Sequence, residues 1–202
     1  MVQASGEGLG CEVAQARKTA ASKVFETAKD LFYRRGIRAV GVDEIVCEAG
    51  VTKPSLYRAF KSKDDLVAAC LEDAAREGRE AVLAAIEAAA DDPRERLRAL
   101  ICYHAEKLRC PEFRGCLASN VAVELPEPTH PGRAVLERCK SQMRSLLVDL
   151  ASAAGAARPN ILADGLMLAI EGAIASHHIF GSTGPAQSLV VTCDALMESQ
   201  LS

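Results

Sequence analysis

Apolar residues recur three and four positions apart over most of the chain, a spacing that predicts helices. The first clear stripe lies near the N-terminus and comprises Val24, Phe25, Ala28, Leu31 and Phe32. Gly36 follows this stripe and is a natural place for the helix to end. The sequence shows neither the apolar–polar alternation of strands nor the turn residues of hairpins. We therefore expect an all-α protein.

Glycine and proline residues divide the remaining pattern into segments, and the expected number of helices is about nine. Ser62, with Asp65 three positions later, resembles a capping box at the start of a long helix. The prolines within residues 125–132 indicate a loop. After the first stripe, the expected helices span residues 42–49, 52–60, 63–90, 93–109, 115–124, 133–154, 159–180 and 185–200.

The second and third expected helices are short and are joined by a tight turn. Gly50 can adopt the left-handed backbone conformation that such a turn requires. Thr52 would cap the second of these two helices, and Val51, Leu56 and Phe60 would anchor it to a core. In helix-turn-helix proteins, a helix held in this way presents its free face to the DNA major groove. The same pattern also occurs without any DNA contact in enzymes and helical bundles.

The free face of this helix carries side chains suited to DNA. Lysine and arginine donate to guanine edges or phosphates, serine donates to either, and a tyrosine hydroxyl suits a phosphate oxygen. A proline offers apolar contact to a thymine methyl group. Lys63 begins the next helix, where backbone N–H groups and the helix dipole favour phosphate. The predicted DNA-binding residues are Lys53, Pro54, Ser55, Tyr57, Arg58 and Lys63.

Four motifs in this part of the chain resemble the DNA-binding head of TetR-type regulators: FYRRGI at 32–37, VDEIV at 42–46, AGVTKPSLYRAF at 49–60 and SKDDL at 62–66. The resemblance covers residues 17–70. It implies a three-helix head on a larger helical body that binds a small molecule and dimerises. It also implies a double-stranded, near-palindromic DNA operator from which the small-molecule effector releases a repressor. Tyr57 and Lys63 match positions that commonly contact phosphate in the family.

Two residues depart from the family's pattern. Gly41 stands where the family often has a serine or threonine, so the cap of the helix at 42–49 lacks a hydroxyl. Pro54 replaces a frequent glycine and stiffens the first turn of the recognition helix, where proline is tolerated. The operator preference of relatives therefore does not transfer to this chain.

The expected domain organisation is a disordered tail at 1–14, a helix-turn-helix DNA-binding domain at 15–62, and a ligand-binding and dimerisation domain at 63–202. The segment 159–180 is apolar on nearly all sides and also carries small residues at helical spacing. We expect it to pack both on its own body and, together with the last helix, on a second copy of the chain. Two helices from each subunit would form a homodimer interface with twofold symmetry. The alternative is a single buried helix in a monomer.

The effector site is predicted only from the resemblance, which implies a cavity among the middle helices beneath the long helix at 63–90. Small-molecule cavities combine apolar walls with a few polar groups. Residues of both kinds in the central part of the chain are candidates for its lining. They are Tyr103, His104, Phe113, Cys116, Asn120, Met143, Met167 and His177.

Charge divides the chain unevenly and supports a nucleic-acid partner for the N-terminal part. Residues 1–63 contain 11 basic and 7 acidic residues, whereas residues 64–202 contain 13 basic and 20 acidic residues. No apolar run is long enough to span a membrane, and the first residues lack the pattern of a secretory signal. We therefore expect a cytoplasmic protein whose eight cysteines are thiols.

Two other functions remain open at this stage. In a thiol-based redox regulator, Cys110 or Cys116 would react, with basic neighbours in the sequence favouring the thiolate. Against it, free cysteines are commonly small buried hydrophobes, and no C-x-x-C motif is present. A helical small-molecule binding protein or an enzyme without DNA binding is the alternative from another class. No catalytic motif and no ligand-spaced Cys/His set is found, so we expect neither an enzyme nor a metal or cofactor.

Overall fold

Several of the described helices begin where the sequence supplies a side-chain cap. In the computed structural model, which describes residues 19–201, Thr19, Ser62 and Asp92 each accept a hydrogen bond from a backbone N–H of the following first turn. The Ser62 hydroxyl also donates to the Asp65 carboxylate at 2.9 Å, as the predicted capping residues suggested. The tail predicted at 1–14 lies outside the described residues.

The described residues form nine α-helices and two short 3-10 turns, and they contain no strand, which confirms the predicted all-α class. The helices are α1 (Ala20–Arg35), α2 (Val42–Glu48), α3 (Lys53–Ala59), α4 (Lys63–Glu87), α5 (Pro93–Lys107), α6 (Leu117–Glu124), α7 (Pro131–Ala153), α8 (Pro159–Phe180) and α9 (Leu189–Glu198).

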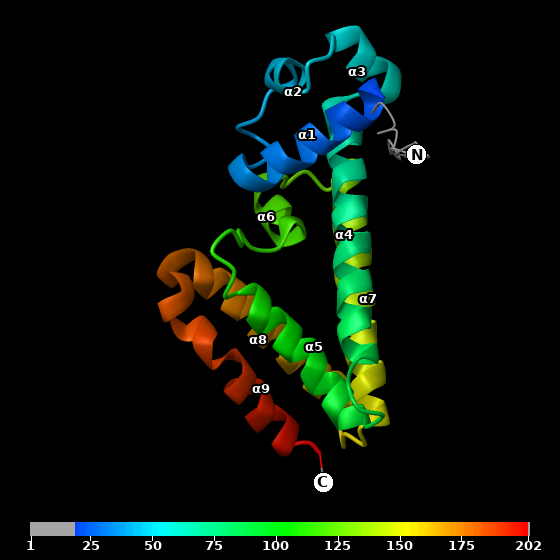
Figure 1. The fold of residues 1–202 in the computed structure, drawn as a ribbon. Coiled ribbons are helices and arrows are strands. Elements are labelled where there is room, and N and C mark those ends of the chain that lie inside the picture. Colours follow the sequence, from blue (N-terminus) through cyan, green and yellow to red (C-terminus); the bar gives the residue numbers. More distant parts are fainter. Residues whose placement is uncertain (1–18, 202) are drawn as a thin grey trace, which may run out of the picture.

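The helices separate into a head and a body (Figure 1). The head consists of α1, α2 and α3 at one end of the molecule. The long helix α4 runs from the head to the opposite end, with α7 packed along it, and α5, α8 and α9 cross obliquely beside this pair. The short helix α6 lies between α1 and the body, so it is placed to connect the two parts.

Two apolar cores match this division. The head core joins buried residues of α1, α2 and α3 to Leu66, Val67 and Cys70 in the first turns of α4. Val121 of α6 also belongs to the head core. The body core is built from α4, α5, α7, α8 and α9. Because α4 contributes to both cores, a shift of this helix would be felt at both ends of the molecule.

Several predicted helix ends differ from the structure. The helix expected at 115–124 begins only at Leu117, because Gly115 has φ +84° and turns the chain before it. The helix expected at 185–200 is interrupted: residues Pro185–Ser188 form a 3-10 turn, and α9 starts at Leu189. The helices expected to reach residues 90 and 109 end at Glu87 and Lys107.

Candidate functional site

The turn between α2 and α3 has the geometry that the sequence predicted. Gly50 has φ +62°, in the left-handed region that favours glycine. The N–H of the next residue, Val51, donates to the Val46 carbonyl at 3.0 Å and closes the turn. Leu56 is fully buried in the head core, which by its burial stabilises α3 by about 2 kcal/mol. The turn and this anchor hold α3 rigidly against α1 and α2.

The predicted cap of α3 needs a correction. Thr52 occupies the N-cap position, but its side chain accepts no hydrogen bond from the backbone of the helix. Its hydroxyl instead lies 3.0 Å from the hydroxyl of Ser55. Pro54 stands in the first turn, where backbone N–H groups have no intrahelical acceptor, so the lack of an N–H at this position costs no hydrogen bond. The start of α3 is therefore held by proline geometry and a hydroxyl pair rather than by a threonine cap.

The outer face of α3 displays four of the predicted DNA-binding residues to solvent. Lys53, Pro54, Tyr57 and Arg58 are exposed, and Ser55 is half-buried beside them. Tyr57, with 48% of its surface exposed, is one of the few large apolar or aromatic side chains on the outside of the head. A tyrosine hydroxyl between two cations offers several hydrogen-bond donors to the phosphates of a polyanion such as DNA.

Both lysines among the predicted DNA-binding residues have partners within the protein. Lys53 forms an ion pair with Asp43 of α2 at 2.7 Å, and this hydrogen bond raises the pKa of the Lys53 side chain. Lys63 donates to the Ile37 carbonyl at 2.6 Å and lies over the Phe32 ring, while burial lowers its pKa. An ammonium has three N–H donors. Lys63 could therefore contact a phosphate while it keeps its hydrogen bond to Ile37, in the loop between α1 and α2.

The body contains a partly open cavity of about 570 Å³, which is lined by α4, α5, α6, α7 and α8 and also by Lys29 and Tyr33 of α1. Its volume lies within the range of small-molecule sites. The position matches the cavity expected beneath the long helix α4. Among the eight residues predicted to line it, the cavity brings together Tyr103, His104, Phe113, Cys116, Met143 and Met167.

The other two predicted lining residues lie elsewhere. Asn120 lies in a separate groove between the end of α1 and α6, and its amide donates to the Arg114 carbonyl at 2.9 Å. It therefore fixes the loop that leads into α6. His177 packs edge-on against the Phe113 ring, with 5.7 Å between the ring centroids, and so supports the wall from behind.

The sequence reasoning missed the most polar part of the cavity. Lys140 of α7 and Glu171 of α8 line it and form an ion pair, and both side chains are largely shielded from solvent. Ser119 of α6 donates to the other carboxylate oxygen of Glu171 at 2.8 Å. A signal was present, because Lys140 and Glu171 interrupt the inward apolar stripes of α7 and α8 with opposite charges.

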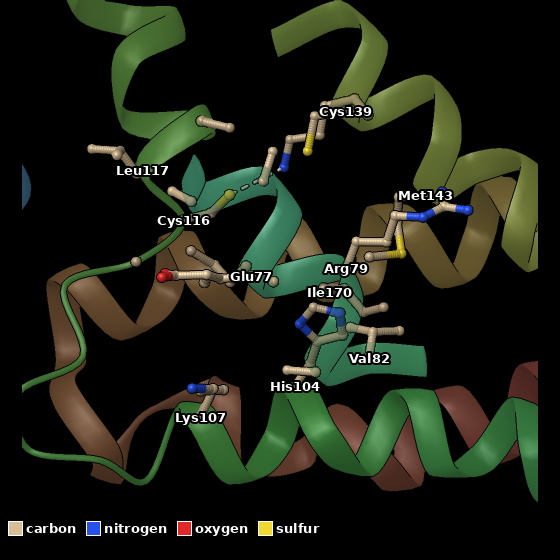
Figure 2. A pocket seen from close by; sticks show the side chains of 18 of the residues that line it. Glu77, Arg79, Val82, His104, Lys107, Cys116, Leu117, Cys139, Met143 and Ile170 are labelled. Carbon is tan, nitrogen blue, oxygen red and sulfur yellow. Dashed lines mark hydrogen bonds between the residues drawn. The ribbon is translucent and has the colours of Figure 1, made fainter. Parts of the chain in front are cut away.

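His104 adds a neutral polar group to the same cavity, into which its ring points (Figure 2). Burial lowers the pKa of this imidazole to about 4, and the nearby Lys140 ammonium adds to that effect. The ring is therefore uncharged at neutral pH. Its Nε2 is buried without a hydrogen-bond partner in the described part of the protein.

The described residues, 19–201, lack the features of membrane proteins and of metal-binding clusters. None of the helices described is long and apolar enough to cross a membrane. Within the same residues, no group of three or more His, Cys, Asp or Glu side chains could hold a metal ion. A rigid helix-turn-helix head on a body with an internal cavity defines a DNA-binding regulator with its own sensor domain.

The comparisons with known proteins agree with this class. The sequence pattern described as "Bacterial regulatory proteins, tetR family" matches residues 24–70. A putative TetR-type regulator from Streptomyces avermitilis is 30% identical, with 91% of this chain and 98% of that chain covered and a TM-score of 0.80. A TetR-family regulator from Streptomyces coelicolor is 28% identical, with 91% and 96% covered and a TM-score of 0.86.

A further relative is the HTH-type transcriptional repressor DhaR of Mycobacterium sp. (strain GP1), 27% identical over 192 residues, which cover 91% of this chain and 96% of DhaR. The chain belongs to the TetR family of bacterial regulatory proteins. It is accordingly a transcriptional regulator and not an enzyme.

Proposed function

We propose that this chain is a homodimeric repressor that binds a near-palindromic DNA operator and leaves it when a small molecule enters the body cavity. The observation that carries the proposal is the two-sided character of α3. Its inner face is fixed by the buried Leu56, while its outer face offers Lys53, Tyr57 and Arg58 to solvent. The relative DhaR, which matches along 91% of this chain, is named a repressor, and this name supports repression.

In this proposal the chain divides into a tail at 1–14, a DNA-binding domain at 15–62 and a ligand-binding and dimerisation domain at 63–202. The outer face of α3 lies in the major groove. Lys53, Ser55 and Arg58 read base edges or phosphates, Pro54 contacts a thymine methyl, and Tyr57 and Lys63 hold phosphates. The protein works in the cytoplasm, where bacterial DNA lies.

The dimer would form through the last two helices. Five of the seven exposed large hydrophobic side chains of the described residues lie on α8 and α9, namely Ile161, Leu168, Ile179, Phe180 and Val191. On α8 the first three of these fall on one helical stripe, together with the exposed Gly172. Exposed apolar side chains gathered on two helices that contact each other indicate a protein partner. A twofold axis through it would hold the two heads for binding to successive major grooves.

The release of DNA requires a path from the cavity to the head, and α6 supplies one. At one face, Ser119 of α6 donates to the cavity residue Glu171. At the C-terminal end of α6, the Glu124 carboxylate accepts from the Arg38 N–H at 2.9 Å, in the loop between α1 and α2. A ligand that prefers the position of α6 in which the heads no longer match the operator shifts the population away from DNA.

The proposal is tested by selecting bound sequences from random duplex DNA with the full-length protein. The expected product is one site with two inverted half-sites, about one helical turn apart from centre to centre. Affinity for this site should fall about a thousandfold between 50 and 200 mM salt if about six phosphates are contacted. Enrichment of no sequence, or of a single half-site only, would contradict the proposed function. An unrelated duplex of equal length is the control.

A further inference from the structure

Three features of the structure meet at Cys116. This residue lines the body cavity and occupies the N-cap position of the eight-residue helix α6. Its Sγ lies 3.6 Å from Nζ of Lys140, the contact drawn as a dashed line from Cys116 in Figure 2. A helix N-terminus and an adjacent ammonium both stabilise negative charge on a thiol sulfur, and a thiolate is the nucleophilic form of cysteine.

Lys140 keeps its proton although it is largely buried. Burial acts to lower the pKa of Lys140, but the Cys116 sulfur and the hydrogen bond to Glu171 outweigh this effect, and the net shift is upward. Glu171 is itself held by Ser119. The cation is therefore fixed beside Cys116 rather than free to swing into solvent. On another side of the cavity, His104 presents a neutral ring with a buried, unpartnered Nε2 (Figure 2).

The other cysteines of the described residues lack this combination. Burial raises the pKa of Cys70 and of Cys193 to about 12, since both lie within the apolar cores. Cys139 lines the same cavity as Cys116, but burial also raises its pKa. Cys47 and Cys110 are exposed at the surface, outside the cavity, and the half-buried Cys102 does not line it either. Cys116 therefore combines two properties: it lines the cavity, and a fixed cation beside it stabilises negative charge on its sulfur.

We propose that the effector of this cavity is an electrophilic small molecule of the α,β-unsaturated carbonyl class, and that Cys116 captures it covalently. The Cys116 sulfur adds to the β-carbon of the ligand, a carbon–sulfur bond forms, and the electron pair of the C=C π bond moves toward the carbonyl oxygen. The proton lost by the thiol ends on the α-carbon. The reaction is an addition, so it needs no oxidant, reductant or other co-reactant.

The surroundings suit this ligand class. The carbonyl oxygen accepts a hydrogen bond from the His104 ring, whose Nε2 otherwise stays unpaired. The Lys140 ammonium stabilises the charge that moves from sulfur to oxygen during the addition. The apolar wall, which includes Val82, Met143 and Ile170, accommodates the hydrocarbon part of the molecule.

The position of Cys116 ties capture to the head. Gly115, directly before it, has φ +84°, and an added Cβ there would lie 2.3 Å from Nε2 of His178. The backbone N–H of Arg114 donates to the Tyr33 hydroxyl of α1 at 2.8 Å. We therefore expect a group added to Cys116 to press on this crowded loop, which is hydrogen-bonded to the head. The pressure would displace α6. This consequence for DNA rests on the proposed function, whereas the capture itself does not.

The test uses reduced, full-length protein and a limiting amount of cyclohex-2-enone as the probe, with the rate of modification of each cysteine measured by peptide mass spectrometry. We expect Cys116 to react at least tenfold faster than the more exposed Cys110. Lys140→Met should lower the rate at Cys116 at least tenfold and leave Cys110 unchanged, while Lys140→Arg, which keeps the cation, should restore most of the rate. Equal rates at Cys116 and Cys110 in the unaltered protein overturn the proposal, even if Lys140→Met does not fold.

The same samples are then bound to the selected operator. The probe should abolish the complex of the unaltered protein and leave that of Cys116→Ser intact, with Cys110→Ser as the matched control that responds normally. Rapid modification of Cys116 without loss of the operator complex would leave capture standing and overturn release through this cavity. Loss of the complex without a gain in protein mass would overturn covalent capture.

Discussion

Replacing Leu168 and Val191 together by glutamate is expected to convert the dimer into monomers and to weaken operator binding by about a thousandfold. Both side chains are 73% exposed in the single chain, so the substitutions leave the folded subunit nearly undisturbed. At a twofold interface they would place four carboxylates against an apolar surface. A monomer binds DNA with one head only. It therefore loses the gain in affinity, about 10²- to 10⁴-fold, that two linked heads provide.

The measurement combines analytical ultracentrifugation with operator titration. Val123→Glu on α6 is the matched control, because Val123 is also an exposed valine, 84% accessible, but belongs to neither of the two helices of the proposed interface. It should remain dimeric and bind the operator. A double variant that sediments as a dimer would show that the subunits meet elsewhere.

Replacing Lys53 and Tyr57 together by alanine is expected to weaken binding to the selected operator by about a hundredfold or more. Each of these exposed side chains supplies a DNA contact in the account, and a good base contact alone contributes about 1–3 kcal/mol. Stability should change by less than about 1 kcal/mol, because neither side chain lies in the head core.

Operator titration and chemical denaturation measure the two effects separately. Arg109→Ala is the control, since it removes an exposed cation from the body instead of the head. Its operator affinity should stay within about twofold of the unaltered protein. If specific binding survives the double substitution, α3 is not the recognition helix.

The parts of the fold that follow from short stretches of sequence were predictable. Gly50, Leu56 and the spacing between them indicated the helix-turn-helix, and the structure has the left-handed turn and the buried anchor in those places. The bounds of α8 were predicted to the residue, because prolines and glycines delimit an apolar segment. In both cases, residues close in sequence determine the local conformation.

The parts that depend on long-range packing were not predictable in this way. Lys140 and Glu171 are paired only because α7 and α8 pack side by side. The sequence of neither segment indicates which residue of the other it will contact. Asn120 and His177 have suitable side chains for a cavity, but they hold the Arg114 loop and the Phe113 ring instead. The sequence indicates which residue types can line a cavity, whereas packing determines which of them face it.

The central claim is that the outer face of α3 touches the operator. The chain has three tyrosines, each in a different setting: Tyr57 on α3, Tyr33 at the junction of head and body, and Tyr103 in the cavity. Photoreactive p-benzoylphenylalanine placed at one of these positions at a time gives three closely matched proteins. With bound operator under ultraviolet light, the account predicts cross-linking to DNA from position 57 and none from position 103. An operator complex that forms normally but cross-links from position 103 and not from position 57 would contradict it.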